Sequence, residues 1–454
     1  MKRHLTETLK KWKTKADRKP LLILGARQVG KTWLMQEFGK AEYKQVVYIR
    51  FDRNTRVHRI FAESNLNMKE LLADIQTEME VKITPNHTLL ILDEIQECPA
   101  ALTALKYFCE DLPEYHVMAA GSLLGVHQHH GTGFPVGKVQ TLHLYPMNFR
   151  EFLEAMGKHE LVQLLNSHNW AKIALFNDKF EHLLKSYYCV GGMPEAVNKY
   201  VETENYAEVR EIQLNILSDY NNDFSKHVPA TLATKLSLLW NSVPMQLSKE
   251  NKRFVYGNVQ KNMRSKDLEA AMDWLHRAGL VHLVHRVNTP SLPLGAYHDG
   301  AFKLFFADIG LLAAKVNLRP SVILNHNEIF KEFKGALTEQ YVQQELRASG
   351  TTELHYWHAE TTHTELDFML QADMNVVPLE VKAEHNTKAK SLLNYCRRYT
   401  PPLAVRASMN DYAVNSLQTN GNQQTTLLDI PLYAISLLTT EAEKALLQRQ
   451  EALH

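Results

Sequence analysis

Short apolar runs separated by helical stretches dominate about the first 150 residues. Four runs that end near polar or glycine residues predict β-strands at Leu21–Leu24, Val46–Phe51, Leu89–Leu92 and Val117–Ala120, and Val139–Leu144 is a fifth candidate. Helical periodicity fills the gaps between the first four runs, and an amphipathic helix beginning near Leu5 precedes them. Strands that are apolar throughout and alternate with helices indicate a parallel sheet covered on both faces. We therefore predict an α/β fold with a doubly wound parallel sheet.

Further along, the pattern changes three times. Residues Phe149–Asp223 have helical periodicity, and Ser265–Ala278 is a capped helix followed by the apolar stretch Leu280–Val287, an order typical of a winged helix. A new α/β pattern begins near residue 335, with a helix at Leu337–Leu346 followed by two strands. The predicted domains are an α/β core at 1–150, a helical lid at 151–225, a winged-helix-like domain at 226–320 and a small α/β domain at 321–454.

Composition narrows the class of protein. The 454 residues suffice for about three domains, and 45% apolar with 22% charged residues is ordinary for a globular protein. A net charge of +1 gives no overall attraction to nucleic acid. Four scattered cysteines argue against a disulfide framework or a thiolate zinc site. The basic N-terminus lacks a following apolar segment, and no run approaches the ~20 apolar residues of a membrane-spanning helix. We expect a cytoplasmic protein with no membrane partner.

A phosphate-binding motif follows the first predicted strand. The spacing is G-x-x-x-x-G-K-T, and the residues expected to contact nucleotide are Gly25, Ala26, Arg27, Gln28, Val29, Gly30, Lys31, Thr32 and Trp33. Glycines let backbone N–H groups face the phosphates, and the following helix directs its positive end at them. Lys31 is expected to reach the β- and γ-phosphates, and the Thr32 hydroxyl to ligate Mg²⁺. The motif predicts ATP and Mg²⁺ as ligands.

Polar residues at the ends of two other strands extend this site. Asp93 ends the third apolar run, where a second Mg²⁺ ligand is expected, and the adjacent Glu94 is a candidate general base for the attacking water. Ser122 ends the fourth run and is expected to position that water, or else to cap a helix. Nearby histidines at 127, 129 and 130 leave zinc binding open as an alternative to a polar loop.

These segments together carry a family resemblance. GARQVGKT, LLILDEIQ, AAGSLLG, YPMNFREFL and YYCVGGMPEAV resemble a large prokaryotic family of AAA+-like P-loop ATPases whose C-terminal domain has no assigned function. The resemblance implies ATP hydrolysis, and AAA+ relatives commonly form rings, so a homo-oligomer is possible. Where the family often has Gly-Arg, this chain has Gly137-Lys138, and lysine provides a point charge without the two-pronged guanidinium of arginine.

Carboxylates are expected to converge in the last domain. In the strands Glu365–Leu370 and Val376–Lys382, alternation places Asp367, Glu380 and Lys382 opposite the apolar faces, and Glu339 lies on the preceding helix. Such carboxylates bind Mg²⁺, and a neighbouring lysine can activate hydroxide. The pattern resembles the PD-(D/E)XK nuclease core. The alternative is a nuclease-like fold without cleavage activity.

Two hypotheses follow for what ATP hydrolysis drives. In the first, the nucleotide state is coupled to DNA binding or processing by the nuclease-like domain. A cluster of basic residues near the predicted winged helix supports DNA contact, although a solvated surface explains it nearly as well. The cluster consists of Lys249, Lys252, Arg253, Lys261, Arg264 and Lys266. In the second, the chain is a nucleotide-gated switch or scaffold for protein partners, and its nuclease fold is inactive.

Overall fold

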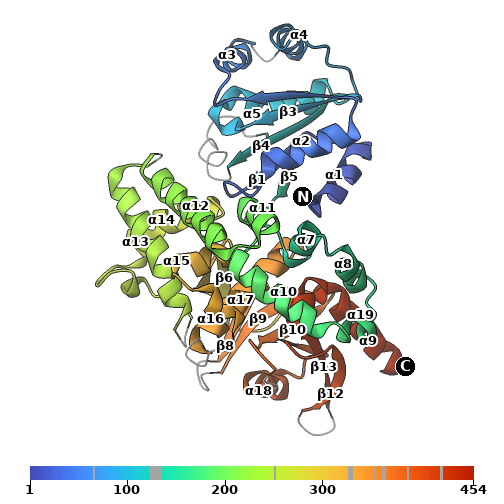
Figure 1. The fold of residues 1–454 in the computed structure, drawn as a ribbon, viewed down its shortest axis with the longest axis vertical. Coiled ribbons are helices and arrows are strands. Elements are labelled where there is room, and N and C mark those ends of the chain that lie inside the picture. Colours follow the sequence, from blue (N-terminus) through green and yellow to red (C-terminus); the bar gives the residue numbers. More distant parts are fainter. Residues whose placement is uncertain are drawn as a thin grey trace. The chain divides into compact units, whose positions relative to one another are not determined.

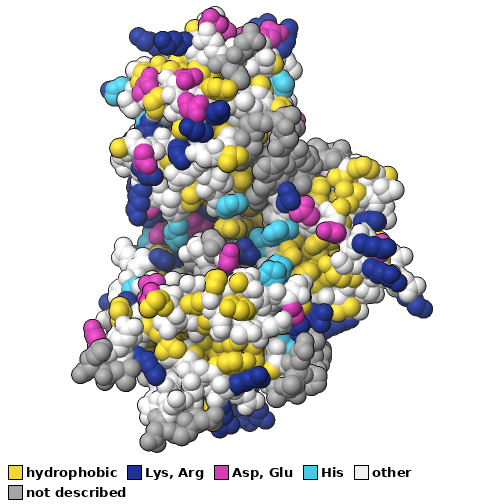
Figure 2. Space-filling model, turned by 180° about the vertical axis from the view of Figure 1, so that it is seen from behind, with side chains coloured by type: hydrophobic (Ala, Val, Ile, Leu, Met, Phe, Trp, Pro, Cys, Tyr) yellow, Lys and Arg dark blue, Asp and Glu magenta, His cyan; other side chains and the backbone are white. Residues whose placement is uncertain are grey.

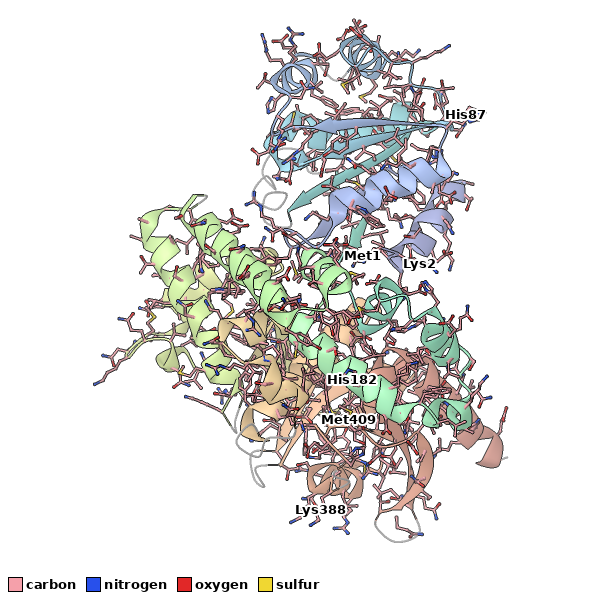
Figure 3. All side chains as sticks on the ribbon, viewed as in Figure 1. Met1, Lys2, His87, His182, Lys388 and Met409 are labelled. Carbon is pink, nitrogen blue, oxygen red and sulfur yellow. The ribbon has the colours of Figure 1, made fainter. Side chains whose placement is uncertain are left out.

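The computed structural model describes most of the chain. The described residues are 1–64, 67–122, 135–226, 228–249, 252–325, 331–351, 353–359, 364–385, 388–419 and 423–453. They form two compact units (Figure 1): unit 1 comprises Met1–Tyr145 with Trp274–Leu280, and unit 2 comprises Pro146–Asp273 with Val281–His454. Side chains fill the interior of each unit (Figure 3), and the largest fully buried ones include Trp12, Phe108, Tyr187 and Trp240.

Unit 1 is an α/β unit in which helices surround a five-stranded sheet. Its elements are α1 (Leu5–Thr14), β1 (Leu21–Gly25), α2 (Lys31–Glu42), β2 (Gln45–Arg50), α3 (Thr55–Glu63), α4 (Met68–Glu78), β3 (Thr88–Asp93), the 3₁₀ helix η1 (Ile95–Glu97), α5 (Pro99–Asp111), β4 (His116–Ser122) and β5 (Gln140–His143). All five predicted strands are present, and every pairing is parallel, in the order β2-β3-β4-β1-β5.

This strand order explains where a site can form. β1 lies inside the sheet and β4 separates it from β3, an arrangement that matches a P-loop fold of the AAA+ type. Strands β1 and β3 are buried along their whole length, because helices cover both faces of the sheet. The carboxyl ends of parallel strands meet at one edge, where a crevice forms beside the point at which the strand order reverses. The predicted doubly wound α/β fold is therefore confirmed.

Helices form the first half of unit 2. They are α7 (Phe149–Ala155), α8 (His159–Asn166), α9 (Trp170–Ala174), α10 (Asn177–Val190), α11 (Pro194–Thr203), α12 (Tyr206–Lys226), α13 (Ala230–Leu247), η2 (Tyr256–Asn258) and the part of α14 (Ser265–Arg277) that precedes Trp274. Asn148 begins α7 with a capping box: its side chain accepts from Glu151 N at 2.9 Å, and Glu151 Oε2 accepts from Asn148 N at 3.1 Å. The helical region predicted after the ATPase core is thus present.

A mixed sheet of eight strands forms the second half. The elements are β6 (Val281–Val287), η3 (Leu294–Tyr297), β7 (His298–Phe306), α15 (Ile309–Lys315), α16 (Pro320–Leu324), α17 (Lys331–Ala348), β8 (His355–Ala359), β9 (Thr364–Ala372), β10 (Asn375–Val381), α18 (Lys390–Tyr399), β11 (Leu403–Ser408), β12 (Ala413–Gln418), β13 (Gln424–Pro431), η5 (Leu432–Leu437) and α19 (Leu438–Leu453). Their order is β12-β13-β11-β10-β9-β8-β6-β7.

This sheet crosses an expected domain boundary. The predicted winged-helix-like domain at 226–320 contains β6 and β7, which pair as an antiparallel hairpin, but β6 also pairs in parallel with β8 beyond that limit. A two-stranded ribbon is marginal alone, and joining the larger sheet satisfies the backbone groups of one of its edges. Strands from the predicted domains at 226–320 and 321–454 therefore belong to one sheet. The predicted domain limits stay untested predictions.

Candidate nucleotide site and carboxylate cluster

The P-loop winds tightly between β1 and α2. Gln28 and Gly30 have left-handed backbone conformations, with φ of 65° and 93°. Gly25 cannot be replaced by a larger residue, because a Cβ there would lie 2.3 Å from the carbonyl oxygen of Leu144. Helix α2 begins at Lys31, directly after this loop, so its unpaired N–H groups face the same space as the loop. The result is a concave backbone cradle suited to phosphate oxygens.

Lys31 lies inside this cradle. Its Nζ donates to the carbonyl oxygens of Gly25 at 3.0 Å and Ala26 at 2.9 Å. Burial lowers the pKa of this ammonium group to about 8, although Glu94 and Asp93 nearby raise it. A cation with incomplete hydration gains strongly from a phosphate oxygen, so the position and environment of Lys31 suit phosphate binding.

Thr32 and Asp93 meet across the sheet edge. Thr32 Oγ1 donates to Asp93 Oδ2 at 2.6 Å, and Tyr48 OH donates to the same oxygen at 2.8 Å. Asp93 is only 2% exposed, and its Oδ1 accepts from the backbone N of Glu94 at 3.1 Å. A hydroxyl and a carboxylate in contact match the two protein ligands that Mg²⁺ takes beside nucleotide phosphates.

Glu94 follows Asp93 in an unusual backbone conformation. Its φ is 52°, in the left-handed region, and its Oε2 accepts from Gln96 Nε2 at 2.6 Å. Left-handed non-glycine residues are uncommon and concentrate at functional sites. Gln96 restrains one oxygen of the carboxylate, which holds the side chain close to the strand end that carries Asp93.

The other predicted nucleotide-site residues differ in their placement. Ser122 is the partner of Gly25 in the register of β1 and β4, but its side chain lies outside the described residues, as do the histidines at 127, 129 and 130. Trp33 is on α2 and is 42% exposed. Lys138 forms a 2.8 Å ion pair with Glu110, so that contact competes with any role of its charge at a phosphate.

Two residues at this site were not singled out from the sequence. Tyr48 on β2 is one, and Arg3 is the other: its guanidinium donates to Val29 O in the P-loop at 2.8 Å and to Tyr145 O at 2.6 Å. Arg3 is 4% exposed. No local pattern marks either residue, because both act through contacts with distant parts of the chain.

The four carboxylate-cluster residues of the last domain come together in unit 2. Glu339 lies on α17, Asp367 on β9, Glu380 on β10 and Lys382 just after it. Asp367 Oδ2 accepts from Val381 N at 2.7 Å, and Lys382 Nζ donates to Glu380 Oε1 at 2.6 Å. A side-chain hydrogen bond also joins Glu339 and Asp367. Strands β9 and β10 pair as an antiparallel hairpin, which brings these side chains to one face.

Two further lysines, which the sequence did not place in this cluster, offset part of its negative charge. Lys303 on β7 is 0% exposed and lies 2.6 Å from Glu365 Oε1 and 3.5 Å from Glu339 Oε2. Lys252, one of the six basic residues noted in the sequence, forms an ion pair with Glu339 Oε1. In the part of the chain that the structure describes, no group of three or more His, Cys, Asp or Glu side chains is arranged to hold a metal ion.

The charges in the cluster perturb one another. Burial favours the neutral form of Glu339, but Lys252 and Lys303 outweigh it and lower the pKa of this carboxyl to about 2. Burial, with Glu339 and Glu380 nearby, raises the pKa of Asp367 well above its usual value. Burial also raises the pKa of Glu380, against the effect of Lys382. Lysine ammonium groups and a proton retained on a carboxyl group therefore offset the negative charge of the cluster.

The remaining basic residues lie on the surface. Lys249, Arg253, Lys261, Arg264 and Lys266 are exposed, whereas Lys252 is largely buried against Glu339. Figure 2 shows Lys and Arg side chains on the segment that carries α13 and α14. In the described residues, no helix is both long and apolar enough to cross a membrane.

Comparisons with known families agree with this fold and phosphate site. The family model of an AAA domain matches residues 17–153. Two domains of unknown function, DUF8612 and DUF4143, match residues 181–322 and 334–433. Together with the strand order and the P-loop, the AAA-domain match supports nucleotide binding by unit 1. It also supports the ATPase activity that AAA domains have. No curated protein matches the chain.

Solved structures show weaker likeness. A Walker-type ATPase of Pyrococcus abyssi is 12% identical with a TM-score of 0.45, covering 68% of this chain and 94% of that one. The Orc1 protein of Aeropyrum pernix, solved in complex with DNA, is 13% identical with a TM-score of 0.26, covering 69% and 90%. AMPPCP-bound DnaA from Aquifex aeolicus is 14% identical with a TM-score of 0.25, covering 61% and 89%. Such low scores say nothing about function.

Proposed function

We propose that unit 1 binds ATP with Mg²⁺ and hydrolyses it to ADP and phosphate. The observation that carries this proposal is the contact of Thr32 with Asp93 at 2.6 Å, next to the partly buried Lys31. Residues Gly25–Thr32 surround the phosphates with backbone N–H groups, and Lys31 neutralises the β- and γ-phosphates. Thr32 and Asp93 would hold Mg²⁺, which would offset charge on the phosphate oxygens.

Glu94 acts as the general base in this proposal. It accepts a proton from water as the water oxygen bonds to the γ-phosphorus, and the bond between that phosphorus and the bridging oxygen breaks to release ADP. The positioning of this water by Ser122 remains a prediction from the sequence. Homo-oligomerisation remains a proposal drawn from the family resemblance.

The test measures ATP binding and phosphate release separately. Lys31→Ala is expected to lose both, whereas Glu94→Gln is expected to keep binding and lose about 10²–10⁴-fold in turnover, the usual contribution of a general base. Lys40→Ala is the matched control, because Lys40 is an exposed lysine on the same helix that pairs with the nearby Glu37 at 2.8 Å. Normal turnover by Glu94→Gln would refute the role of Glu94.

For the coupled activity, we favour nucleotide-dependent DNA binding without cleavage. The exposed residues Lys249, Arg253, Lys261, Arg264 and Lys266 support DNA contact. The pairing of Glu339 with Lys252 and Lys303 argues against the cleavage part of the first hypothesis, because lysines hold the carboxylates that a divalent ion would need. The alternative, a nucleotide-gated switch for protein partners with an inactive nuclease fold, shares this observation.

Measurements of phosphate release and binding with added DNA distinguish these two candidate functions. Stimulation of phosphate release by DNA, lost in Glu94→Gln, together with gel shifts that vanish when the five exposed basic residues become alanine, would support DNA binding. Turnover that is indifferent to DNA would favour the switch. Nicking of plasmid DNA with Mg²⁺ or Mn²⁺ that is abolished by Asp367→Asn would restore the nuclease hypothesis.

A further inference from the structure

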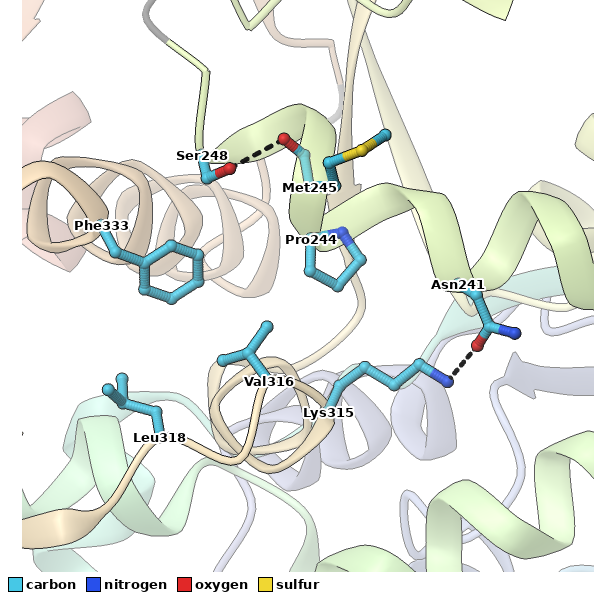
Figure 4. A pocket seen from close by; sticks show the side chains of 8 residues that line it. All are labelled: Asn241, Pro244, Met245, Ser248, Lys315, Val316, Leu318 and Phe333. Atoms are coloured by element: carbon cyan, nitrogen blue, oxygen red, sulfur yellow. Dashed lines mark hydrogen bonds between the residues drawn. The ribbon is translucent and has the colours of Figure 1, made fainter. Parts of the chain in front are cut away.

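A surface groove of about 640 Å³ lies in unit 2 between three helical segments (Figure 4). Asn241, Pro244 and Met245 come from α13, with Ser248 just after it, Lys315 ends α15, Val316 and Leu318 follow it, and Phe333 belongs to α17. Its volume is within the ~300–1,000 Å³ typical of small-molecule sites. Neither the nucleotide site nor the carboxylate cluster uses any of these residues.

The two ends of the groove differ in chemistry. At one end, Lys315 Nζ donates to Asn241 Oδ1 at 2.6 Å, which leaves the amide nitrogen of Asn241 as a second donor beside it. The lining toward the other end is apolar, and Figure 4 shows Val316, Leu318 and Phe333 on that side, with Pro244 between the two ends. A ligand that matches both ends has one polar head and an apolar body.

Lys315 indicates that the polar head of the ligand is negatively charged. Burial lowers the pKa of its ammonium group, and within the described residues no carboxylate forms an ion pair with it. Its other neighbour is the face of Trp240, whose ring centre is 5.6 Å from Nζ. A half-buried cation whose described partners are an amide oxygen and an aromatic ring gains from a hydrogen bond to an anion.

The walls of the groove are fixed in place. Pro244 lies inside α13, where it is largely buried, and its rigid ring forms the middle of the lining. On the opposite side, Arg210 donates to the carbonyl oxygen of Leu318 at 2.8 Å, which anchors the segment after α15. Met245 remains 43% exposed, an apolar side chain that a ligand would cover.

We propose that this groove binds a small monocarboxylate with an apolar tail. The carboxylate accepts from Lys315 Nζ and Asn241 Nδ2, and the tail lies along Pro244, Val316, Leu318 and Phe333. A single cation suits a singly charged head group, whereas a phosphate-rich ligand would need several. The proposal is independent of ATP hydrolysis.

The experiment measures binding of octanoate and of octanamide to the full-length protein by calorimetry or ligand-observed NMR. Octanoate is expected to bind saturably, and octanamide at least about tenfold more weakly, since it lacks the charge. Lys315→Met should weaken octanoate at least about tenfold and leave octanamide almost unchanged. Lys235→Met, on the same helix as Asn241 but outside the groove lining, is the matched control and should bind octanoate normally.

Asn241→Ala and Phe333→Ala keep the test decisive if Lys315→Met does not fold. The first should weaken octanoate selectively, and the second should weaken both ligands. Absence of saturable octanoate binding, equal affinity for the amide, or octanoate binding unaffected by Lys315→Met would each overturn the proposal. A short apolar peptide that binds where octanoate does not would likewise overturn it.

Discussion

The backbone N of Phe149 donates a 2.7 Å hydrogen bond to Oε1 of Glu345, a residue 196 positions further along the chain. Glu345 is 0% exposed on α17. Just before Phe149, Met147 is held by two further bonds: its N donates to Gly192 O at 2.7 Å, and its O accepts from Tyr187 OH at 2.5 Å. The first residues of unit 2 are thus held in its interior by the buried carboxyl group of Glu345 together with Gly192 and Tyr187.

We expect Glu345 to make stability fall as pH rises. Burial raises the pKa of its carboxyl from 4.5 to about 8, with Phe149 N opposing the shift and Glu151 adding to it. An acid with a raised pKa binds its proton more tightly in the folded state, so stability decreases between about pH 4.5 and 8. For Glu345→Gln, which keeps a carbonyl acceptor and carries no charge, the free energy of unfolding should vary less with pH.

The measurement is denaturant unfolding of both proteins from pH 6 to pH 8. The wild type should lose roughly 2 kcal/mol more than Glu345→Gln over that window. Subtracting the two curves cancels the titration of all other groups that the substitution leaves unchanged. Parallel curves would show that Glu345 is ionised throughout.

Gly192 should tolerate no side chain. A Cβ at this position would lie 2.0 Å from Met147 O and 2.7 Å from Met147 N, and both atoms belong to the backbone. Gly192→Ala is therefore expected to destabilise the protein by at least about 1–3 kcal/mol, as overpacking does. In Gly335→Ala, on helix α17, the new Cβ meets nothing within 4 Å, so this control should be neutral or stabilising. Similar thermal midpoints for the two variants would contradict the expected clash.

The sequence predicted local features well. Each apolar run became a strand, and G-x-x-x-x-G-K-T fixed the P-loop, because periodicity and glycine placement act over a few residues. The long-range pairs were out of reach: nothing near Lys303 in the chain shows that it reaches Glu365, and nothing near Glu345 shows that it binds Phe149. The same limitation applied to the β6–β7 hairpin, since only the folded chain pairs β6 with β8.

Lys303 should be essential for the stability of unit 2. Lys303→Met keeps an unbranched chain but leaves Glu339 and Glu365 without this buried cation, and breaking a buried pair costs about 3–5 kcal/mol. Lys10→Met removes an exposed pair with Glu7 and should cost less than about 1 kcal/mol. Chemical denaturation of both variants checks this difference. Stabilisation by Mn²⁺ of the wild type but not of Asp367→Asn would mean that a metal binds where lysines are expected to neutralise the carboxylates.

Magnesium should strengthen ATP binding through Thr32. Its hydroxyl lies 2.6 Å from Asp93 Oδ2, so the two oxygens are placed to hold one cation, and Thr32→Val removes the hydroxyl with little change in shape. We expect the wild type to bind ATP more weakly when EDTA replaces Mg²⁺, and Thr32→Val to show a much smaller difference between the two conditions. Tyr48→Phe is the matched comparison, because it removes the other hydroxyl bonded to Asp93 Oδ2, at 2.8 Å, without removing a predicted ligand. It should retain most of the Mg²⁺ effect. Equal loss in both variants would mean that the orientation of Asp93, rather than ligation by Thr32, controls the metal dependence.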